Sequence, residues 1–207
     1  MPKTVKERKR ITQRIVTIDD IKNVLSAIKE GGKHREFTAR QCKNYTALVL
    51  FGAYTGQRPT ATIRKLTVGQ FRAALGLDPH MLDVLPQQDK IRMQHYVPLH
   101  PCVIDAVTPL LDGRNRKDDT RIFAHEYFDK WALRKKIPLV HGGHFVCGDL
   151  RKFAEQYGDI IQWEQSNRAY VLTHGVSGVD WRFYKSPLPE HVNDVYLQYW
   201  QNTQVGS

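Results

Sequence analysis

One segment of the sequence is apolar on every side of a predicted helix, and this constrains the fold more than any other feature. The helix begins at Thr38, which can form a capping box with Gln41. It continues through ALVLFGAY at 47–54 and ends at Gly56 and Pro59, since glycine accepts a left-handed cap and proline cannot extend the hydrogen-bond ladder. A helix that is hydrophobic all round has to be buried. We therefore expect other elements to surround it.

Amphipathic helices are predicted on both sides of this central helix, because apolar residues recur there at helical spacing. They cover residues 18–30 (capped by Thr17 and stopped by Gly31 and Gly32), 101–111, 125–135, 149–157 and, after Pro187 and Pro189, 192–200. Between Leu66 and Leu99 the helical pattern weakens, and short runs separated by Gly, Pro and Asp predict a small antiparallel sheet. The predicted fold class is mainly α with a small antiparallel sheet (α+β).

The length of 207 residues suits one generous domain or two small ones. We expect a basic N-terminal arm at 1–16, a main domain at 17–186, and a C-terminal helix and tail at 187–207. The first fourteen residues, MPKTVKERKRITQR, carry six basic side chains and one acid with almost nothing apolar. Such a composition predicts a solvated arm.

The charge balance points to a polyanionic partner. Lys and Arg outnumber Asp and Glu by 31 to 21, which gives a formal net charge of +10 and a pI near 9.6. There is no run of about 18 apolar residues for a membrane span and no apolar region of a secretory signal, so we expect a soluble, cytoplasmic protein with no membrane partner. The three cysteines, Cys42, Cys102 and Cys147, are widely spaced and include no C-x-x-C pair. This argues against a disulfide scaffold or a zinc ribbon.

Five polar residues stand out by their order along the chain rather than by their individual surroundings. They are Arg58 in TGQR, Lys90 ahead of VPL, Arg151 in DLRKF, His174 in LTHG and Tyr184 in WRFY. Taken singly, the first arginine is typical of an exposed turn, and the second is typical of the outward face of a short helix. Only the series as a whole indicates chemistry.

This series resembles the catalytic domain of the tyrosine recombinases, and looks most like the integrases of archaeal viruses and plasmids. The resemblance covers the chain from about Thr17 to Trp200. It implies that residues 17–186 form a mainly helical catalytic domain that binds one face of double-stranded DNA. The implied activity is site-specific recombination or integration, in which DNA is cleaved and rejoined through a 3′-phosphotyrosine intermediate. The implied assembly is a homotetramer on DNA, and neither a cofactor nor a metal is required.

The resemblance also implies a role for each residue. Tyr184 would attack the phosphate and, with an ordinary tyrosine pKa of about 10, would need nearby cations or a base. Arg58 and Arg151 would bind the charge that grows on the non-bridging oxygens. His174 would add a donor to the same phosphate, and Lys90 would protonate the leaving 5′-oxygen.

Two positions depart from the family pattern. Gly148 stands three residues before Arg151, where the family commonly has His or Lys. His144, four residues earlier, is a candidate replacement, with a structural role as the alternative. Ala61 stands where the family usually has a glutamate after the first arginine, which leaves the support of Arg58 open.

Two other functions stay open at this stage. The chain could be a DNA-binding accessory protein of the same fold in which Gly148 marks a catalytically decayed site. It could also be a metal-dependent nuclease, since His141, His144 and Cys147 have H-x₂-H-x₂-C spacing suited to zinc, although a fourth ligand is not obvious beyond nearby Asp149.

The C-terminal helix also has two interpretations. Most amphipathic helices of this kind close the core of their own domain. The resemblance instead implies docking on a neighbouring subunit, and the linker KSPLPE, with its two prolines, favours such an exchange slightly.

Overall fold

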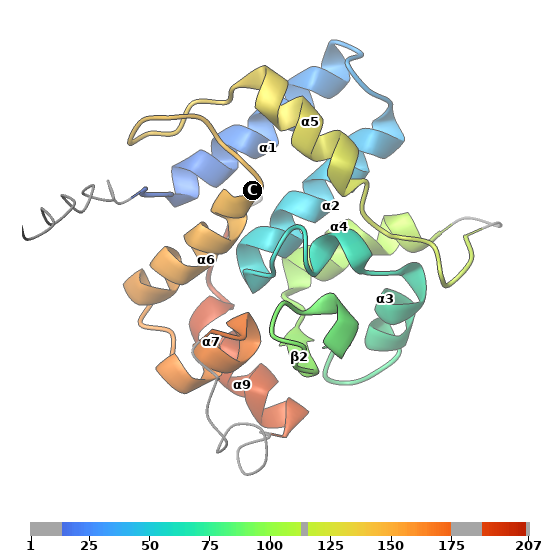
Figure 1. Cartoon of the computed structure of the whole chain (residues 1–207), viewed down its shortest axis with the longest axis vertical. Helices are drawn as coiled ribbons and strands as arrows, with labels where there is room; N and C mark the ends of the chain where they lie inside the picture. Colours follow the sequence, from blue (N-terminus) through green and yellow to red (C-terminus); the bar gives the residue numbers. More distant parts are fainter. Residues whose placement is uncertain (1–13, 113–115, 175–187, 206–207) are drawn as a thin grey trace, which may run out of the picture.

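The fold is taken from a computed structural model, and the structure describes residues 14–112, 116–174 and 188–205. Figure 1 shows a set of packed helices with one small hairpin in the lower half of the view. In chain order the elements are α1 (Ile18–Lys33), α2 (Ala39–Thr55), the 3₁₀ turn η1 (Ile63–Lys65), α3 (Val68–Leu75), β1 (Met81–Val84), the 3₁₀ turn η2 (Pro86–Gln88), β2 (His95–Pro98), α4 (Pro101–Leu111), α5 (His125–Lys135), α6 (Gly148–Ile160), α7 (Gln165–Leu172) and α9 (Pro189–Trp200).

Helix α2 forms the centre of the core, as its apolar sequence predicts. Every residue from Ala47 to Thr55 is buried, and the helix packs against α1, α4 and α6. The predicted capping box is present: the Gln41 amide donates to the Thr38 hydroxyl at 3.2 Å, and the Thr38 amide donates to the Gln41 side chain at 2.9 Å. The buried central helix is confirmed.

Helices α2 and α6 approach each other closely at one glycine. A Cβ atom on Gly52 would lie 2.6 Å from a side-chain carbon of Leu150, a distance that real contacts do not allow. The glycine therefore lets α6 lie directly against the last turn of α2. Arg151 follows Leu150, so this contact also carries Arg151 toward the end of α2.

The end predicted for α1 is wrong by a few residues. The helix passes through Gly31 and Gly32 to Lys33, and the amide of His34 then donates to the Glu30 carbonyl at 2.9 Å. Glycine in a helix costs about 1 kcal/mol relative to alanine but keeps its backbone donor, so it weakens a helix without necessarily ending it.

The predicted antiparallel sheet is present as one hairpin. Strand β1 pairs with β2 in a register that places Met81 opposite Pro98 and Val84 opposite His95. The same stretch of sequence also contains α3, which was not predicted, and α7 was missed as well. Each has eight residues, or about two turns, which is too short for a clear periodic signal.

Helix α9 closes the core of its own chain in this structure. Tyr196 and Trp200 are fully buried. The Tyr196 hydroxyl donates to the Tyr54 carbonyl at 3.0 Å, and the Tyr54 hydroxyl donates to the Thr203 carbonyl at 2.7 Å. This is the first of the two arrangements considered for the C-terminal helix.

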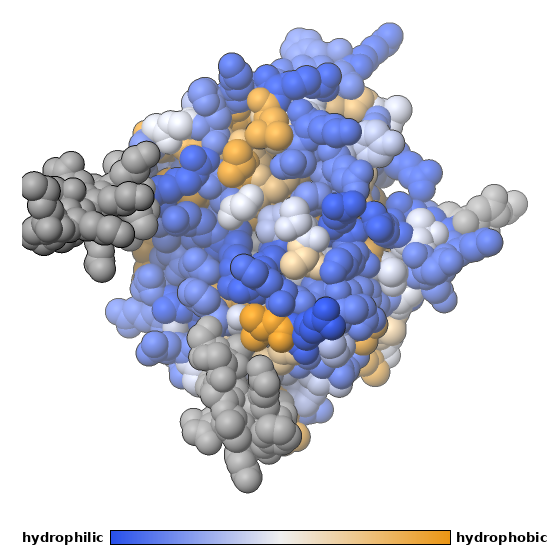
Figure 2. Space-filling model, in the orientation of Figure 1, coloured by the Kyte–Doolittle hydropathy of each residue, from blue (hydrophilic) through white to orange (hydrophobic). Residues whose placement is uncertain are grey.

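The surface is predominantly hydrophilic on the face that carries α5, α6 and α7. Figure 2 shows hydrophobic residues there only in small separate groups. Within the described ranges, no helix is both long enough and apolar enough to cross a bilayer.

Candidate active site

Arg58 is placed by the sharp turn that ends α2. Gly56 adopts a left-handed conformation (φ +62°), and a Cβ atom there would lie 2.3 Å from a Leu172 methyl carbon, so only glycine fits. The turn directs the Arg58 side chain inward, where it is 20% exposed. Its Nη1 donates to the Thr173 hydroxyl at 2.8 Å and lies 3.4 Å from Oδ1 of Asp89. Arg58 is therefore not an ordinary exposed turn residue.

Arg151 lies on the inner side of α6 rather than its outward face, with 13% of the side chain exposed. Its Nε donates to Glu155 at 3.0 Å, Nη1 donates to the Gly56 carbonyl at 3.1 Å, and Nη2 donates to the Leu172 carbonyl at 2.8 Å. Burial, followed by the positive charge of Arg58, lowers the pKa of Arg151. Two largely buried guanidinium groups from α6 and the end of α2 thus converge.

Asp89 and Thr173 connect Arg58 to the hairpin and to the end of α7. The Thr173 hydroxyl donates to Oδ1 of Asp89 at 3.0 Å, and the Asp89 side chain is fully buried. Thr173 has φ +49°, a strained conformation for a β-branched residue, and its bonds to Arg58 and Asp89 help to hold it there. Asp89 supplies the carboxylate that Ala61 cannot, so the support of Arg58 comes from the hairpin.

Lys90 lies in the loop between β1 and β2, as predicted, and its side chain is exposed. Oδ2 of the neighbouring Asp89 accepts from the amides of Ile91 at 3.1 Å and Met93 at 3.3 Å. These bonds fold the loop around Asp89 and fix the backbone on both sides of Lys90. No hydrogen bond or ion pair engages the Lys90 ammonium among the residues described, so it is available to a ligand.

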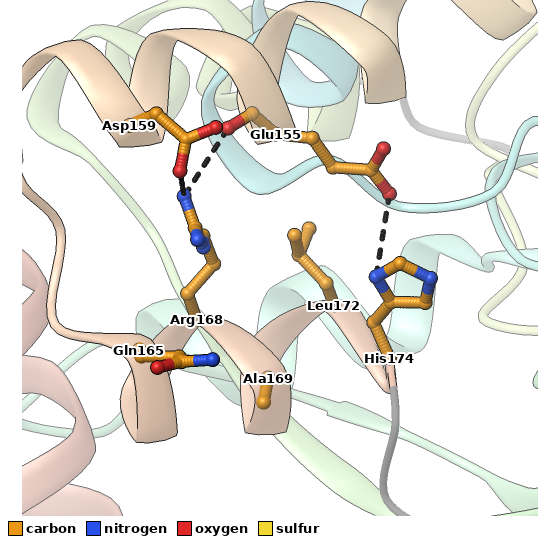
Figure 3. Close-up of a pocket in the computed structure, with 7 residues that line it drawn as sticks. All are labelled: Glu155, Asp159, Gln165, Arg168, Ala169, Leu172 and His174. Atoms are coloured by element: carbon orange, nitrogen blue, oxygen red, sulfur yellow. Dashed lines mark hydrogen bonds and ion pairs between the residues drawn. The ribbon is translucent and has the colours of Figure 1, made fainter.

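His174 follows α7 directly and stands at one end of a groove between α6 and α7 (Figure 3). The groove has a volume of about 290 Å³, and an ion pair between Arg168 and Asp159 lies at its other end. His174 is 67% exposed, and its Nδ1 lies 4.0 Å from Oε1 of Glu155. Glu155 therefore stands between Arg151 and His174.

Sequence reasoning did not identify Asp89, Thr173 or Glu155. Glu155 follows Arg151 at the i, i+4 spacing of helical ion pairs, and that signal was readable. Asp89 and Thr173 carried no local signal, because their roles arise from contacts across the chain.

The Gly148 position is open. This glycine begins α6 and is exposed, and a Cβ atom there would meet no heavy atom within 4 Å. His144 is also exposed, and among the described residues no contact joins its side chain to Arg58 or Arg151. The structure thus leaves space at Gly148 but does not bring His144 into the arginine cluster.

Arg14 ties the N-terminal segment to the start of α6. It donates through Nε and Nη2 to the two carboxylate oxygens of Asp149 at 2.5 and 2.7 Å, and through Nη2 to the His144 carbonyl at 2.5 Å. The hydrogen bond to Asp149 raises the pKa of Arg14. The buried Asp149 also accepts from the Val146 amide at 2.8 Å. The last residues of the predicted arm therefore pack on the element that carries Arg151.

Tyr184, the predicted nucleophile, lies outside the described residues. Its predicted role stays a prediction. The described chain stops at His174 on one side of this segment and resumes at Leu188 on the other.

The predicted alternative of a zinc site lacks the required geometry. His141 and His144 are exposed, whereas Cys147 is buried, and burial raises the pKa of its thiol. In the part of the chain that the structure describes, no three His, Cys, Asp or Glu side chains come together as metal ligands would.

Comparison with known proteins supports the fold. No protein-family model matches the chain, and no curated protein sequence matches it. The solved structures similar to it include the crystal structure of XerA recombinase, with a TM-score of 0.51 and 15% sequence identity. The match covers 90% of this chain and 64% of that one, so the chain spans less than two thirds of the XerA chain. The chain has the mainly helical fold of this part of a tyrosine recombinase, and the fold class predicted from the sequence is confirmed.

Proposed function

We propose that the chain cleaves and rejoins DNA as the catalytic domain of a site-specific tyrosine recombinase or integrase. The observation that supports this most strongly is the convergence of Arg58 and Arg151. Placing two cations together in a largely buried site is unfavourable unless anions balance them. Asp89 and Glu155 match these two charges one for one, and the exposed Lys90 beside Asp89 adds a positive charge that a phosphodiester can balance.

The arginines keep donors for a phosphate. A guanidinium has five N–H groups. Arg151 uses three of them on Glu155, Gly56 and Leu172, which leaves two. Such fixed donors suit the negative charge that develops on the non-bridging oxygens of a pentacoordinate transition state.

The proposed reaction is balanced without a cofactor. The Tyr184 hydroxyl loses its proton to solvent and its oxygen attacks phosphorus, the bond to the 5′-oxygen breaks, and the Lys90 ammonium gives a proton to that oxygen. His174 donates to the same phosphate from the end of α7. A second 5′-hydroxyl then reverses the step: it gives its proton to the neutral Lys90 amine and attacks phosphorus, and the released tyrosine oxygen takes a proton from solvent.

The decisive test is a nicked suicide DNA substrate, which traps the covalent intermediate. The chain should form a covalent protein–DNA adduct, and Tyr184→Phe should abolish it, since a phenyl ring has no nucleophilic oxygen. Tyr199→Phe, a half-buried tyrosine of α9, is the matched control and should form the adduct normally. Adduct formation by Tyr184→Phe would rule out the proposed nucleophile.

A catalytically inactive DNA-binding protein of this fold is the second candidate. This candidate is favoured by Gly148, because a glycine offers no side chain at a position where the family commonly has His or Lys. In the same assay this alternative predicts tight duplex binding without an adduct. DNA cleavage that a chelator abolishes and that Tyr184→Phe leaves unchanged would instead indicate the metal-dependent nuclease.

The biological setting belongs to the same proposal. We place the activity in the cytoplasm, on double-stranded DNA, in a homotetramer. Archaeal viruses or plasmids are the proposed source.

A further inference from the structure

A small pocket at the start of α5 combines positive charge with an unsatisfied buried side chain. It has a volume of about 160 Å³ and is lined in part by Arg64, Arg121, His125 and Glu126. None of these residues belongs to the candidate active site. The pocket is therefore a separate feature of the molecule.

The two arginines come from segments that short backbone contacts hold together. Arg64 belongs to η1, which packs against α5. Arg121 is fixed beside η1 because the Ile122 amide donates to the Leu66 carbonyl at 3.0 Å, within a bridge between Thr67 and Arg121. The backbone thus presents both guanidinium groups at the same pocket.

Glu126 is the only acid bound to these arginines among the described residues. Its Oε1 lies 2.8 Å from Nη2 of Arg64 and 4.0 Å from Nη1 of Arg121, and its side chain is 53% exposed. One carboxylate between two arginines leaves a net charge of +1. A half-exposed carboxylate can also turn out into solvent and leave its position to another anion.

His125 is the independent indication of a ligand. The residue is 5% exposed, and neither of its ring nitrogens has a hydrogen-bond partner. Buried polar atoms without a partner are rare in folded proteins, because each loses its water without compensation. His125 is one of the residues that line the same pocket as the two arginines.

The first turn of α5 adds donors to the pocket. Ala124 precedes the helix and provides no side-chain cap, and its own amide is occupied by Asn44 at 2.7 Å. The amides that follow in the first turn point toward the helix N-terminus, where the helix dipole also favours an anion.

We infer that this pocket binds a backbone phosphate of duplex DNA away from the scissile phosphate, with Glu126 occupying the site until DNA replaces it. The ligand chemistry is a phosphate group, which a small inorganic anion shares. The choice of DNA rests on the proposed function. The alternative is a structural ion pair with no ligand.

The first test uses equilibrium duplex binding between 50 and 200 mM salt, in a Tyr184→Phe background that removes the covalent step. Glu126→Gln should bind a duplex several-fold more tightly than Glu190→Gln. Glu190 is the matched control, since it is also an exposed glutamate in the first turn of a helix, α9. Both variants change the charge equally, so equal affinities would overturn the inference.

The second test removes the arginines. Arg64→Ala combined with Arg121→Ala should reduce the slope of log K against log salt by about 1, the value for one lost phosphate contact. Arg134→Ala, an exposed arginine in the last turn of the same helix, should leave the slope nearly unchanged. Equal slopes for the double variant and the control would contradict the assignment.

The role of His125 is tested by His125→Phe, which fills a similar volume without polar atoms. We expect an equal or higher melting temperature together with weaker duplex binding. A purely structural histidine would give no loss of binding, and that result would remove His125 from the site.

Inorganic phosphate separates the two sources of the ligand. NMR signals of His125 and of the first α5 amides should shift saturably with phosphate, and not in the Arg64→Ala, Arg121→Ala variant. If phosphate binds but the Arg64→Ala, Arg121→Ala variant has the same salt slope for duplex binding as the parent protein, the site is one for a small anion and the DNA inference is overturned. If the adduct assay fails while these results hold, the proposed chemistry falls and this binding site stands.

Discussion

At the scale of single residues, the candidate site depends on one hydroxyl. The Thr173 Oγ1 joins the Arg58 guanidinium to the buried Asp89 carboxylate. The side-chain partners of Arg58, Asp89 and Thr173, both lie far from it in the sequence. The orientation of the arginine is therefore set jointly by the hairpin and the end of α7.

Thr173→Val should separate this role from general stability, because valine keeps the branched shape and removes the hydroxyl. We expect adduct formation to slow by about 10- to 100-fold, as for a misplaced reacting group, and the unfolding free energy to fall by about 1 kcal/mol. Rates from the suicide substrate and urea denaturation would measure the two effects.

Thr62→Val is the matched control. Thr62 is fully buried, and its hydroxyl has no partner. Its replacement should therefore leave stability unchanged or higher and leave cleavage unaffected. If the two valine variants behaved alike, the connection through Thr173 would have no special role.

The residues of this network show why sequence alone could predict only part of the site. The arginines stood in recognisable motifs. Thr173, by contrast, meets Arg58 across 115 positions of sequence, and nothing near Asp89 in the sequence reports that it will be buried. A partnership formed only by the tertiary fold leaves no local pattern.

At the scale of elements, the N-terminal segment acts as a strap on α6. Arg14 pairs with the buried Asp149, while the Val16 amide donates to the Gln156 side chain at 2.8 Å. Both contacts fix the helix that carries Arg151.

Arg14→Ala should therefore destabilise the protein by about 1–3 kcal/mol, because Asp149 keeps its charge in a buried place and loses its cation. The cost falls below that of a fully buried pair because Arg14 is 36% exposed. Chemical denaturation provides the measurement. Lys33→Ala breaks a pair with Glu30 that is exposed on both sides and should cost less than Arg14→Ala. A larger loss for Lys33→Ala would contradict the strap.

Elements differed in how far their sequences predicted them. Helix α2 was predictable because its apolar sequence demands burial whatever surrounds it. Helices α4 and α5 begin and end where the pattern placed them, at 101–111 and 125–135. The eight-residue α3 and α7 were missed because they owe their stability to packing rather than to a long periodic stretch.

At the scale of the whole molecule, buried histidines couple stability to pH. His95, His100 and His125 are each at most 5% exposed, and burial lowers the pKa of each below the usual 6.5. Below about pH 6.5 the unfolded chain binds protons that the folded chain does not, so stability is lost as the pH falls. Well above that pH all three are neutral in both states and contribute no pH dependence.

We expect the melting temperature to fall steeply between pH 6.5 and 5.5 and only slightly from 7.5 to 6.5. His95→Gln should flatten this dependence. His34→Gln, at an exposed site, should leave it as it is. A melting temperature that is level from pH 7.5 to 5.5 would refute the coupling.

The bonds of Arg151 to the carbonyls of Gly56 and Leu172 have an evolutionary consequence. They fasten α6 to the ends of α2 and α7, so selection for a folded protein alone would retain this arginine even in a descendant without the proposed strand cleavage. Lys90 and His174 are exposed, and among the described residues their side chains do not tie helices together as Arg151 does. In descendants that had lost the proposed chemistry, we would therefore expect substitutions at Lys90 and His174 to appear before substitutions at Arg151.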